Sequence, residues 1–231
     1  MKIVILDGYT LNPGDLSWQG FQSLGDCDIH ERTSPGDVLK RSQGAEIVLT
    51  NKTVLSRDTI AALHALKYIG VLATGYNVVD TKAAAQQGIT VTHVPEYGTR
   101  SVAQMVFAHI LNHCHHVAEH SQGVREGAWS RSKDFCFWDY PQVELSGKTL
   151  GIVGLGRIGT SVATVAMAFG MRVLAHQHVA HPVGVTGVAL TDLPTLFRAS
   201  DVVSLHCPLT EQNRGFVNAE HPQPGQRNIR V

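Results

Sequence analysis

The sequence lacks both a net charge and a hydrophobic run long enough to cross a membrane. Its 19 Lys and Arg residues balance its 19 Asp and Glu residues, which argues against a general attraction to nucleic acid or to an anionic membrane. No apolar stretch approaches the roughly 20 residues that a transmembrane helix needs. The first eight residues are typical of a strand and have no signal-peptide layout. We therefore expect no nucleic-acid partner and no membrane association.

Cysteine is also scarce. The four cysteines lie far apart and form no CxxC pair, so neither a disulfide framework nor a zinc ribbon is expected. A hydrophobic content of 43% with 16% charged residues is typical of a globular protein. Together these features indicate a cytoplasmic protein in a reducing compartment.

The first part of the chain alternates short apolar strands with helix-length segments. Strands are predicted over residues 2–7, 27–31, 46–50, 68–73 and 90–94, and helices over 15–24, 35–43, 56–65 and 80–87. This alternation is typical of βαβ units in a parallel sheet. We predict an α/β fold that begins with a flavodoxin-like domain over residues 1–98.

The pattern changes after residue 98. One long helix, opened by a Thr or Ser cap, is predicted over residues 99–121. An irregular segment rich in aromatic residues follows at 129–141. Its rings suit either a contact with a partner subunit or a contact with the chain's own core, and the sequence favours neither.

A second βαβ series begins at residue 149. Its predicted strands are 149–153, 171–175 and 201–206, and its helices are 157–169 and 193–199. Residues 221–231 contain two prolines and one glycine without periodicity, so we predict a disordered tail there. A doubly wound fold needs a second mononucleotide half, so the predicted Rossmann-type domain over residues 99–220 is incomplete.

Three glycines mark a dinucleotide site in this second series. Gly154, Gly156 and Gly159 have the spacing G-x-G-x-x-G and lie between a predicted strand and a predicted helix. The first glycine permits a tight turn, the second lets backbone approach a pyrophosphate, and the third lets helix and strand pack closely. The alternative, a turn with only a structural role, fits this context less well. We predict an NAD site here.

The acid expected about 20 residues further on is missing. The second strand is followed by Gln177, which can hydrogen-bond a ribose hydroxyl but carries no charge. No arginine lies there to bind a 2′-phosphate. We therefore predict NAD as the cofactor and do not exclude NADP.

Several segments resemble a known family. They occur in the family's order, cover about residues 1–220, and comprise residues 72–77, 97–104, 135–140, 151–159 and 204–210. The set is similar to the D-isomer-specific 2-hydroxyacid dehydrogenases, and most of all to their glycerate dehydrogenase, or hydroxypyruvate reductase, branch. The resemblance implies hydride transfer between NAD(P)H and a short 2-keto or 2-hydroxy acid, with hydroxypyruvate and glycerate as the expected pair, and it implies a homodimer.

The resemblance also implies roles for individual residues. Backbone N–H groups of one loop would hold the substrate carboxylate, namely those of Ala73, Thr74, Gly75 and Tyr76. Cofactor contacts would come from Thr74 and Val102 at the nicotinamide, Arg157 and Ile158 at the pyrophosphate, and Cys207 and Pro208 at the adenosine.

The family's Arg, His and acidic residue for catalysis follow residue 220 in the family's order, where the match ends. We therefore assign no catalytic residue, and we transfer no role to Arg227 or Arg230 in the unmatched tail. Little or no turnover is expected because a general acid/base contributes roughly 10²–10⁴-fold, and our hypothesis for the ending is a frameshift or premature stop. The alternatives are a non-catalytic NAD-binding or dimerising module and a fragment that folds poorly.

Histidine is abundant, with 13 residues. His109, His113, His116 and His120 would form one stripe along the predicted helix. Two histidines four residues apart can chelate a metal, but no further ligand completes a recognisable set. We favour a polar helix face and predict no metal site.

Overall fold

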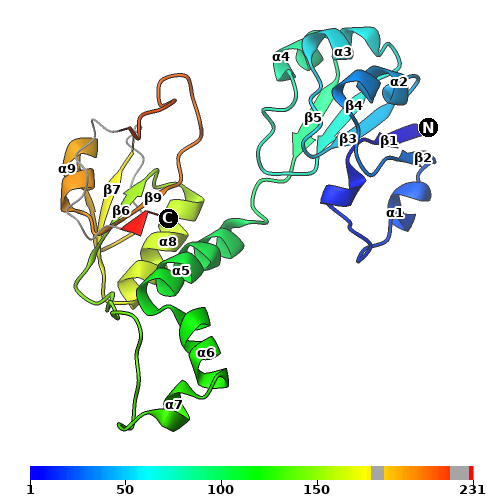
Figure 1. The fold of residues 1–231 in the computed structure, drawn as a ribbon. Coiled ribbons are helices and arrows are strands. Elements are labelled where there is room, and N and C mark those ends of the chain that lie inside the picture. The colour runs from blue at the N-terminus through cyan, green and yellow to red at the C-terminus, as the bar shows by residue number, and fades with distance from the viewer. Residues whose placement is uncertain (178–184, 219–228, 231) are drawn as a thin grey trace. The chain divides into compact units, whose positions relative to one another are not determined.

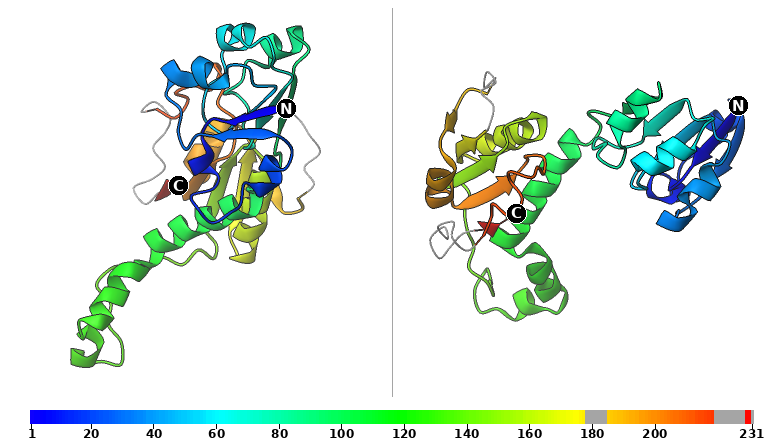
Figure 2. Two further views of the ribbon diagram at one scale, coloured as in Figure 1. Left: turned by 90° about the vertical axis from the view of Figure 1, so that its right-hand side faces the viewer. Right: turned by 90° about the horizontal axis from the view of Figure 1, so that it is seen from above.

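The computed structural model describes residues 1–177, 185–218 and 229–230, and it divides the chain into two compact units. The first unit is Met1–Tyr97 and the second is Gly98–Val231. In each unit the strands lie side by side in one sheet (Figures 1 and 2). The prediction of an α/β fold is confirmed.

The first unit contains a five-stranded parallel sheet in the order β2-β1-β3-β4-β5, which is the flavodoxin-like order. Its strands are β1 (Lys2–Ile5), β2 (Asp26–Ile29), β3 (Ile47–Thr50), β4 (Tyr68–Val71) and β5 (Thr90–His93). Its α-helices are α1 (Gln19–Gln22), α2 (Val38–Ser42), α3 (Arg57–Ala62) and α4 (Thr81–Gln86), with 3-10 turns at Gly8–Thr10 and Pro35–Asp37. Each strand predicted for this unit is therefore confirmed.

Local sequence explains the helix starts of this unit. The Asp80 carboxylate accepts the Ala83 N–H at 2.9 Å and begins α4, and the Ser56 hydroxyl accepts the Thr59 N–H to begin α3. Such caps satisfy N–H groups that the first helical turn leaves without a partner. Buried aliphatic side chains of β1, β3 and β4 pack with residues of α2–α4 in the larger core of the unit.

The second unit has a parallel sheet in the order β8-β7-β6-β9-β10. Its strands are β6 (Thr149–Val153), β7 (Arg172–His176), β8 (Val188–Leu190), β9 (Val202–Leu205) and β10 (Ile229–Arg230), and two of its helices are α8 (Arg157–Ala168) and α9 (Leu193–Ala199). In sequence order this is 3-2-1-4-5, the order of the doubly wound dinucleotide fold. The sequence did not predict β8, and it predicted no strand in the tail that contains β10. Residues 219–228 and 231 of that region lie outside the described residues.

The single long helix predicted over residues 99–121 is wrong. The structure has α5 (Thr99–His115) and α6 (Val117–Arg125), separated by His116 in the left-handed conformation with φ 47°. The cap of α5 is Gly98, without a side-chain cap, instead of Thr or Ser. The His116 ring stacks on Tyr140 at 4.6 Å, a contact that helical periodicity cannot reveal.

The break also ends the predicted histidine stripe. His109 and His113 lie on α5, whereas His120 lies on α6. The His120 Nδ1 is 2.9 Å from the His116 carbonyl oxygen, and its Nε2 accepts the Asp139 N–H at 3.3 Å. Within the described part of the chain, no group of three or more His, Cys, Asp or Glu side chains is arranged to hold a metal ion.

The hydrophobic face of α5 packs on α8 and the second sheet, through the core residues Ala103, Val106, Phe107 and Ile110. The short α7 (Ala128–Arg131) follows α6 beyond the end of α5 (Figure 1). None of the described helices is both long enough and apolar enough to span a membrane.

Candidate cofactor and substrate sites

The glycine turn after β6 has a backbone that only glycine suits at its first position. Gly154 has φ 98°, and its N–H donates to the His176 carbonyl at 2.8 Å. A Cβ at this position would lie 2.6 Å from the backbone nitrogen of Cys207. Gly154 therefore allows the turn to pass between the ends of β7 and β9.

The other two glycines of the motif face different surroundings. A Cβ on Gly159 would lie 2.1 Å from the Gly154 carbonyl oxygen, so α8 packs directly on the turn. A Cβ on Gly156 would meet no described atom within 4 Å. The Gly156 position is therefore not constrained by packing within the protein, and the space above it is open.

This open space lies at the N-terminus of α8. The first hydrogen bond of the helix runs from the Thr160 N–H to the Gly156 carbonyl at 2.8 Å. Amides of the preceding turn have no partner within the helix and carry the positive end of its dipole. The turn therefore fits a pyrophosphate, which needs both the donors and room for its oxygens.

Strand order brings the residues predicted at the ribose and the adenosine to the same edge. The end of β6 pairs with β7 on one side and β9 on the other. Gln177 follows β7 and is half-buried, while Cys207 and Pro208 follow β9. Ligands of doubly wound sheets bind at the point where neighbouring connections diverge to opposite sides, which is the position of the glycine turn between these two strands.

Sequence reasoning assigned no role to the side chain of His206. Its Nε2 lies 2.9 Å from the Ser204 hydroxyl, and burial lowers the pKa of the imidazole. Its backbone N–H donates to the Val153 carbonyl at 2.7 Å, and its own carbonyl faces Gly154. A neutral His206 thus forms part of the wall behind the glycine turn.

The predicted substrate loop follows β4 in the first unit. Ala73 is buried, whereas Thr74, Gly75 and Tyr76 are exposed. In the described part of the chain, no hydrogen bond uses the N–H groups of these three exposed residues. Three consecutive available donors at the carboxyl edge of a parallel sheet are suited to binding an anion.

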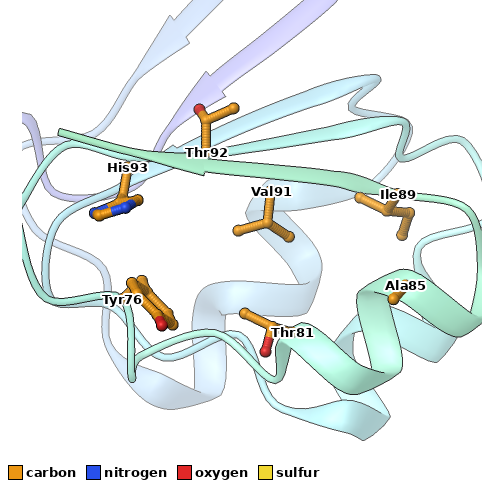
Figure 3. A pocket seen from close by; sticks show the side chains of 7 residues that line it. All are labelled: Tyr76, Thr81, Ala85, Ile89, Val91, Thr92 and His93. Carbon is orange, nitrogen blue, oxygen red and sulfur yellow. The ribbon is translucent and has the colours of Figure 1, made fainter. Parts of the chain in front are cut away.

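Tyr76 also borders a hollow of about 360 Å³ between α4 and β5 (Figure 3). The hollow is lined mainly by carbon atoms of Tyr76, Thr81, Ala85, Ile89, Val91, Thr92 and His93. The rings of Tyr76 and His93 meet edge to face, with centroids 5.0 Å apart. Sequence reasoning missed His93, because the residue carries no motif and meets the loop only after folding.

A second residue missed by sequence reasoning is Asp7, which ends the apolar run of β1. The residue is 4% exposed, and its carboxylate accepts hydrogen bonds from the N–H groups of Asn51, Lys52 and Thr53. It therefore holds the turn after β3 in shape. That turn lies beside the substrate loop, because the Leu72 N–H donates to the Thr50 carbonyl and the Leu55 N–H to the Val78 carbonyl.

The two residues predicted near the nicotinamide fall in different units. Thr74 belongs to the loop after β4, and Val102 lies exposed in the first turns of α5.

Comparison with known proteins places the chain beside one enzyme family. Residues 107–224 match the model of the D-isomer specific 2-hydroxyacid dehydrogenase NAD binding domain. The chain is 48% identical over 225 residues to a hydroxypyruvate reductase of Blautia hydrogenotrophica, covering 96% of this chain and 70% of that protein. It is 37% identical over 228 residues to a glycerate dehydrogenase of Methylorubrum extorquens, covering 98% and 70%.

A solved structure shows the same architecture. An acyclic imino acid reductase in complex with NADPH and D-Arg superposes with a TM-score of 0.76 at 26% identity, covering 92% of this chain and 67% of that one.

The chain belongs to the D-isomer specific 2-hydroxyacid dehydrogenase family. The predicted class is confirmed: an oxidoreductase that uses NAD(P) and acts on the CH–OH group of small 2-hydroxy acids. The comparisons offer no support for the non-catalytic alternative.

Proposed function

We propose that the chain binds NADH at the carboxyl edge of the second sheet for the reduction of hydroxypyruvate to glycerate. The observation that carries this proposal is the open space at Gly156, at the start of α8. On either side of it, close packing requires glycine at positions 154 and 159. The names of the two relatives, hydroxypyruvate reductase and glycerate dehydrogenase, support the substrate. The cofactor supplies the hydride, and the protein supplies binding and orientation.

The roles proposed for individual residues follow from their positions. The first-turn amides of Ile158 and Gly159, with the Arg157 side chain, would contact the pyrophosphate. Gln177 would bind the ribose hydroxyls, and Cys207 and Pro208 would line the adenosine pocket. At the other end of the cofactor, Thr74 and Val102 would lie near the nicotinamide.

The substrate carboxylate would be held by the loop after β4, which consists of Ala73, Thr74, Gly75 and Tyr76. Its support is the set of three N–H groups that no described residue uses. N–H donors bind an anion without requiring a charged side chain.

NAD is the proposed cofactor, and the preference for NAD over NADP depends on Gln177. An amide cannot repel a 2′-phosphate as a carboxylate would, and the similar imino acid reductase holds NADPH. Discrimination between the two cofactors should therefore be modest.

Titration of the purified chain with NADH and with NADPH, followed by cofactor fluorescence, tests the proposal. We expect saturable binding of both, with NADH the tighter ligand. A parallel NMR titration with hydroxypyruvate should move the backbone amides of Thr74 to Tyr76. Absence of NADH binding at millimolar cofactor would overturn the proposed function.

We further propose that the chain forms a homodimer through the segment from α6 to Tyr140. Phe137 and Tyr140 pack inside this segment against His120, but Phe135 is 90% exposed and Trp138 is 68% exposed. Large exposed rings on one short segment are typical of an interface, and this favours the partner-subunit interpretation of the aromatic stretch.

We also propose a cytoplasmic location. The four cysteines are free thiols in the structure, as expected in a reducing compartment.

A further inference from the structure

Two consecutive residues at the end of β5 bind two consecutive carbonyls of the substrate loop. The Val94 N–H donates to the Ala73 carbonyl at 3.1 Å. The His93 Nδ1 lies 2.9 Å from the Thr74 carbonyl oxygen. Because a carbonyl oxygen can only accept, this contact places the imidazole hydrogen on Nδ1.

These two contacts set the direction of the N–H groups that follow. In a trans peptide the C=O and the N–H of one peptide unit point in opposite directions, and the described chain has no cis peptide bond. With the Ala73 and Thr74 carbonyls turned toward β5, the N–H groups of Thr74 and Gly75 point away from it. These are two of the three donors that no described residue uses.

We propose that His93 is a positioning residue for the substrate. By donating from Nδ1 to the Thr74 carbonyl, it aims the Gly75 N–H at the carboxylate of the 2-keto acid. This inference rests on the proposed role of the loop in carboxylate binding and adds the residue that orients the donor.

The surroundings of His93 explain why the ring keeps this orientation. Figure 3 shows His93 hanging from β5 toward Tyr76 at one end of the hollow. The Tyr76 ring, which belongs to the loop, packs edge to face against the His93 imidazole. His93 thus contacts the loop through a hydrogen bond and through packing, and the two contributions can be separated by substitution.

Two variants separate them. His93→Asn keeps an N–H donor near the position of Nδ1 but removes the ring, and His93→Phe keeps a ring but removes the donor. His64→Phe serves as the matched control, because His64 is an exposed histidine of the same unit. The probe is oxamate, a 2-keto acid analogue, with the uncharged oxamide for comparison, titrated by NMR while the Gly75 amide is followed.

We expect oxamate to bind wild-type chain and His64→Phe equally, to bind His93→Asn nearly as well, and to bind His93→Phe about 10-fold more weakly. NADH affinity should be the same in all four proteins. Equal oxamate affinity in His93→Phe and wild type would overturn the inference, as would a loss confined to His93→Asn, which would assign the effect to packing.

The failure of the proposed function looks different in the same experiment. If wild-type chain binds NADH but oxamate leaves the loop amides unmoved, the carboxylate role of the loop falls, and the role of His93 falls with it. If wild-type chain does not bind NADH, the cofactor proposal falls, whereas the oxamate comparison still decides the role of His93.

Discussion

Replacement of Gly156 by alanine should damage cofactor binding without damaging the fold. A methyl group at Gly156 meets no described atom within 4 Å, and the residue has ordinary negative φ. The methyl group would occupy the open space at the N-terminus of α8 and keep a pyrophosphate from approaching the backbone. Gly159→Ala is the matched comparison, because it is the same substitution three residues away in a crowded position.

The structure sets the expected size of each effect. A hydrogen bond to a charged group is worth about 1.5–3 kcal/mol, so losing one phosphate contact in Gly156→Ala should weaken NADH binding about 10- to 100-fold. In Gly159→Ala the new Cβ lies 2.1 Å from the Gly154 carbonyl oxygen, and overpacking of this kind costs about 1–3 kcal/mol of folding free energy. Because alanine is a poorer N-cap than glycine, Gly156→Ala should lower the unfolding temperature slightly. Gly159→Ala should lower it by several degrees.

Thermal unfolding without cofactor and NADH fluorescence titration measure the two effects independently. If Gly156→Ala binds NADH as tightly as wild type, the open space at Gly156 is not the pyrophosphate site. If Gly156→Ala unfolds as early as Gly159→Ala, the Gly156 position is constrained by packing and the prediction fails.

Three further predictions follow from buried or exposed groups. Burial lowers the pKa of His206 in the folded chain, so below the ordinary histidine pKa of about 6.5 the unfolded chain binds more protons than the folded chain. The unfolding free energy should therefore fall as the pH drops below that value. His206→Asn should flatten this dependence, as measured by urea titrations at several pH values. Asp7→Ala should lower the unfolding free energy of the first unit by about 3 kcal/mol, because three N–H groups lose a carboxylate acceptor that is itself buried. An unchanged urea midpoint would contradict this. Replacing the exposed Phe135 and Trp138 by serine should shift the chain from dimer to monomer in sedimentation equilibrium without changing NADH affinity, and a wild-type monomer would refute the dimer proposal.

Local signals in the amino-acid sequence are sufficient to predict part of this fold. Apolar runs of four to six residues alternating with helix-length segments predicted the five strands of the first sheet. The spacing of Gly154, Gly156 and Gly159 between a strand and a helix predicted the turn that the structure shows. These features depend on neighbouring residues only, so periodicity and spacing are sufficient to find them.

Contacts between residues far apart in the sequence could not be predicted, because they form only when the chain folds. The Asp7 carboxylate binds a turn 44 to 46 residues away, and the His93 ring reaches the Thr74 carbonyl 19 residues back along the chain. The helix break at His116 is accompanied by stacking on Tyr140, which no helical pattern encodes. The three glycines of the motif also differ in a way that the sequence does not show. A Cβ at Gly154 or Gly159 would collide with backbone atoms, whereas a Cβ at Gly156 would extend into open space that a ligand could occupy.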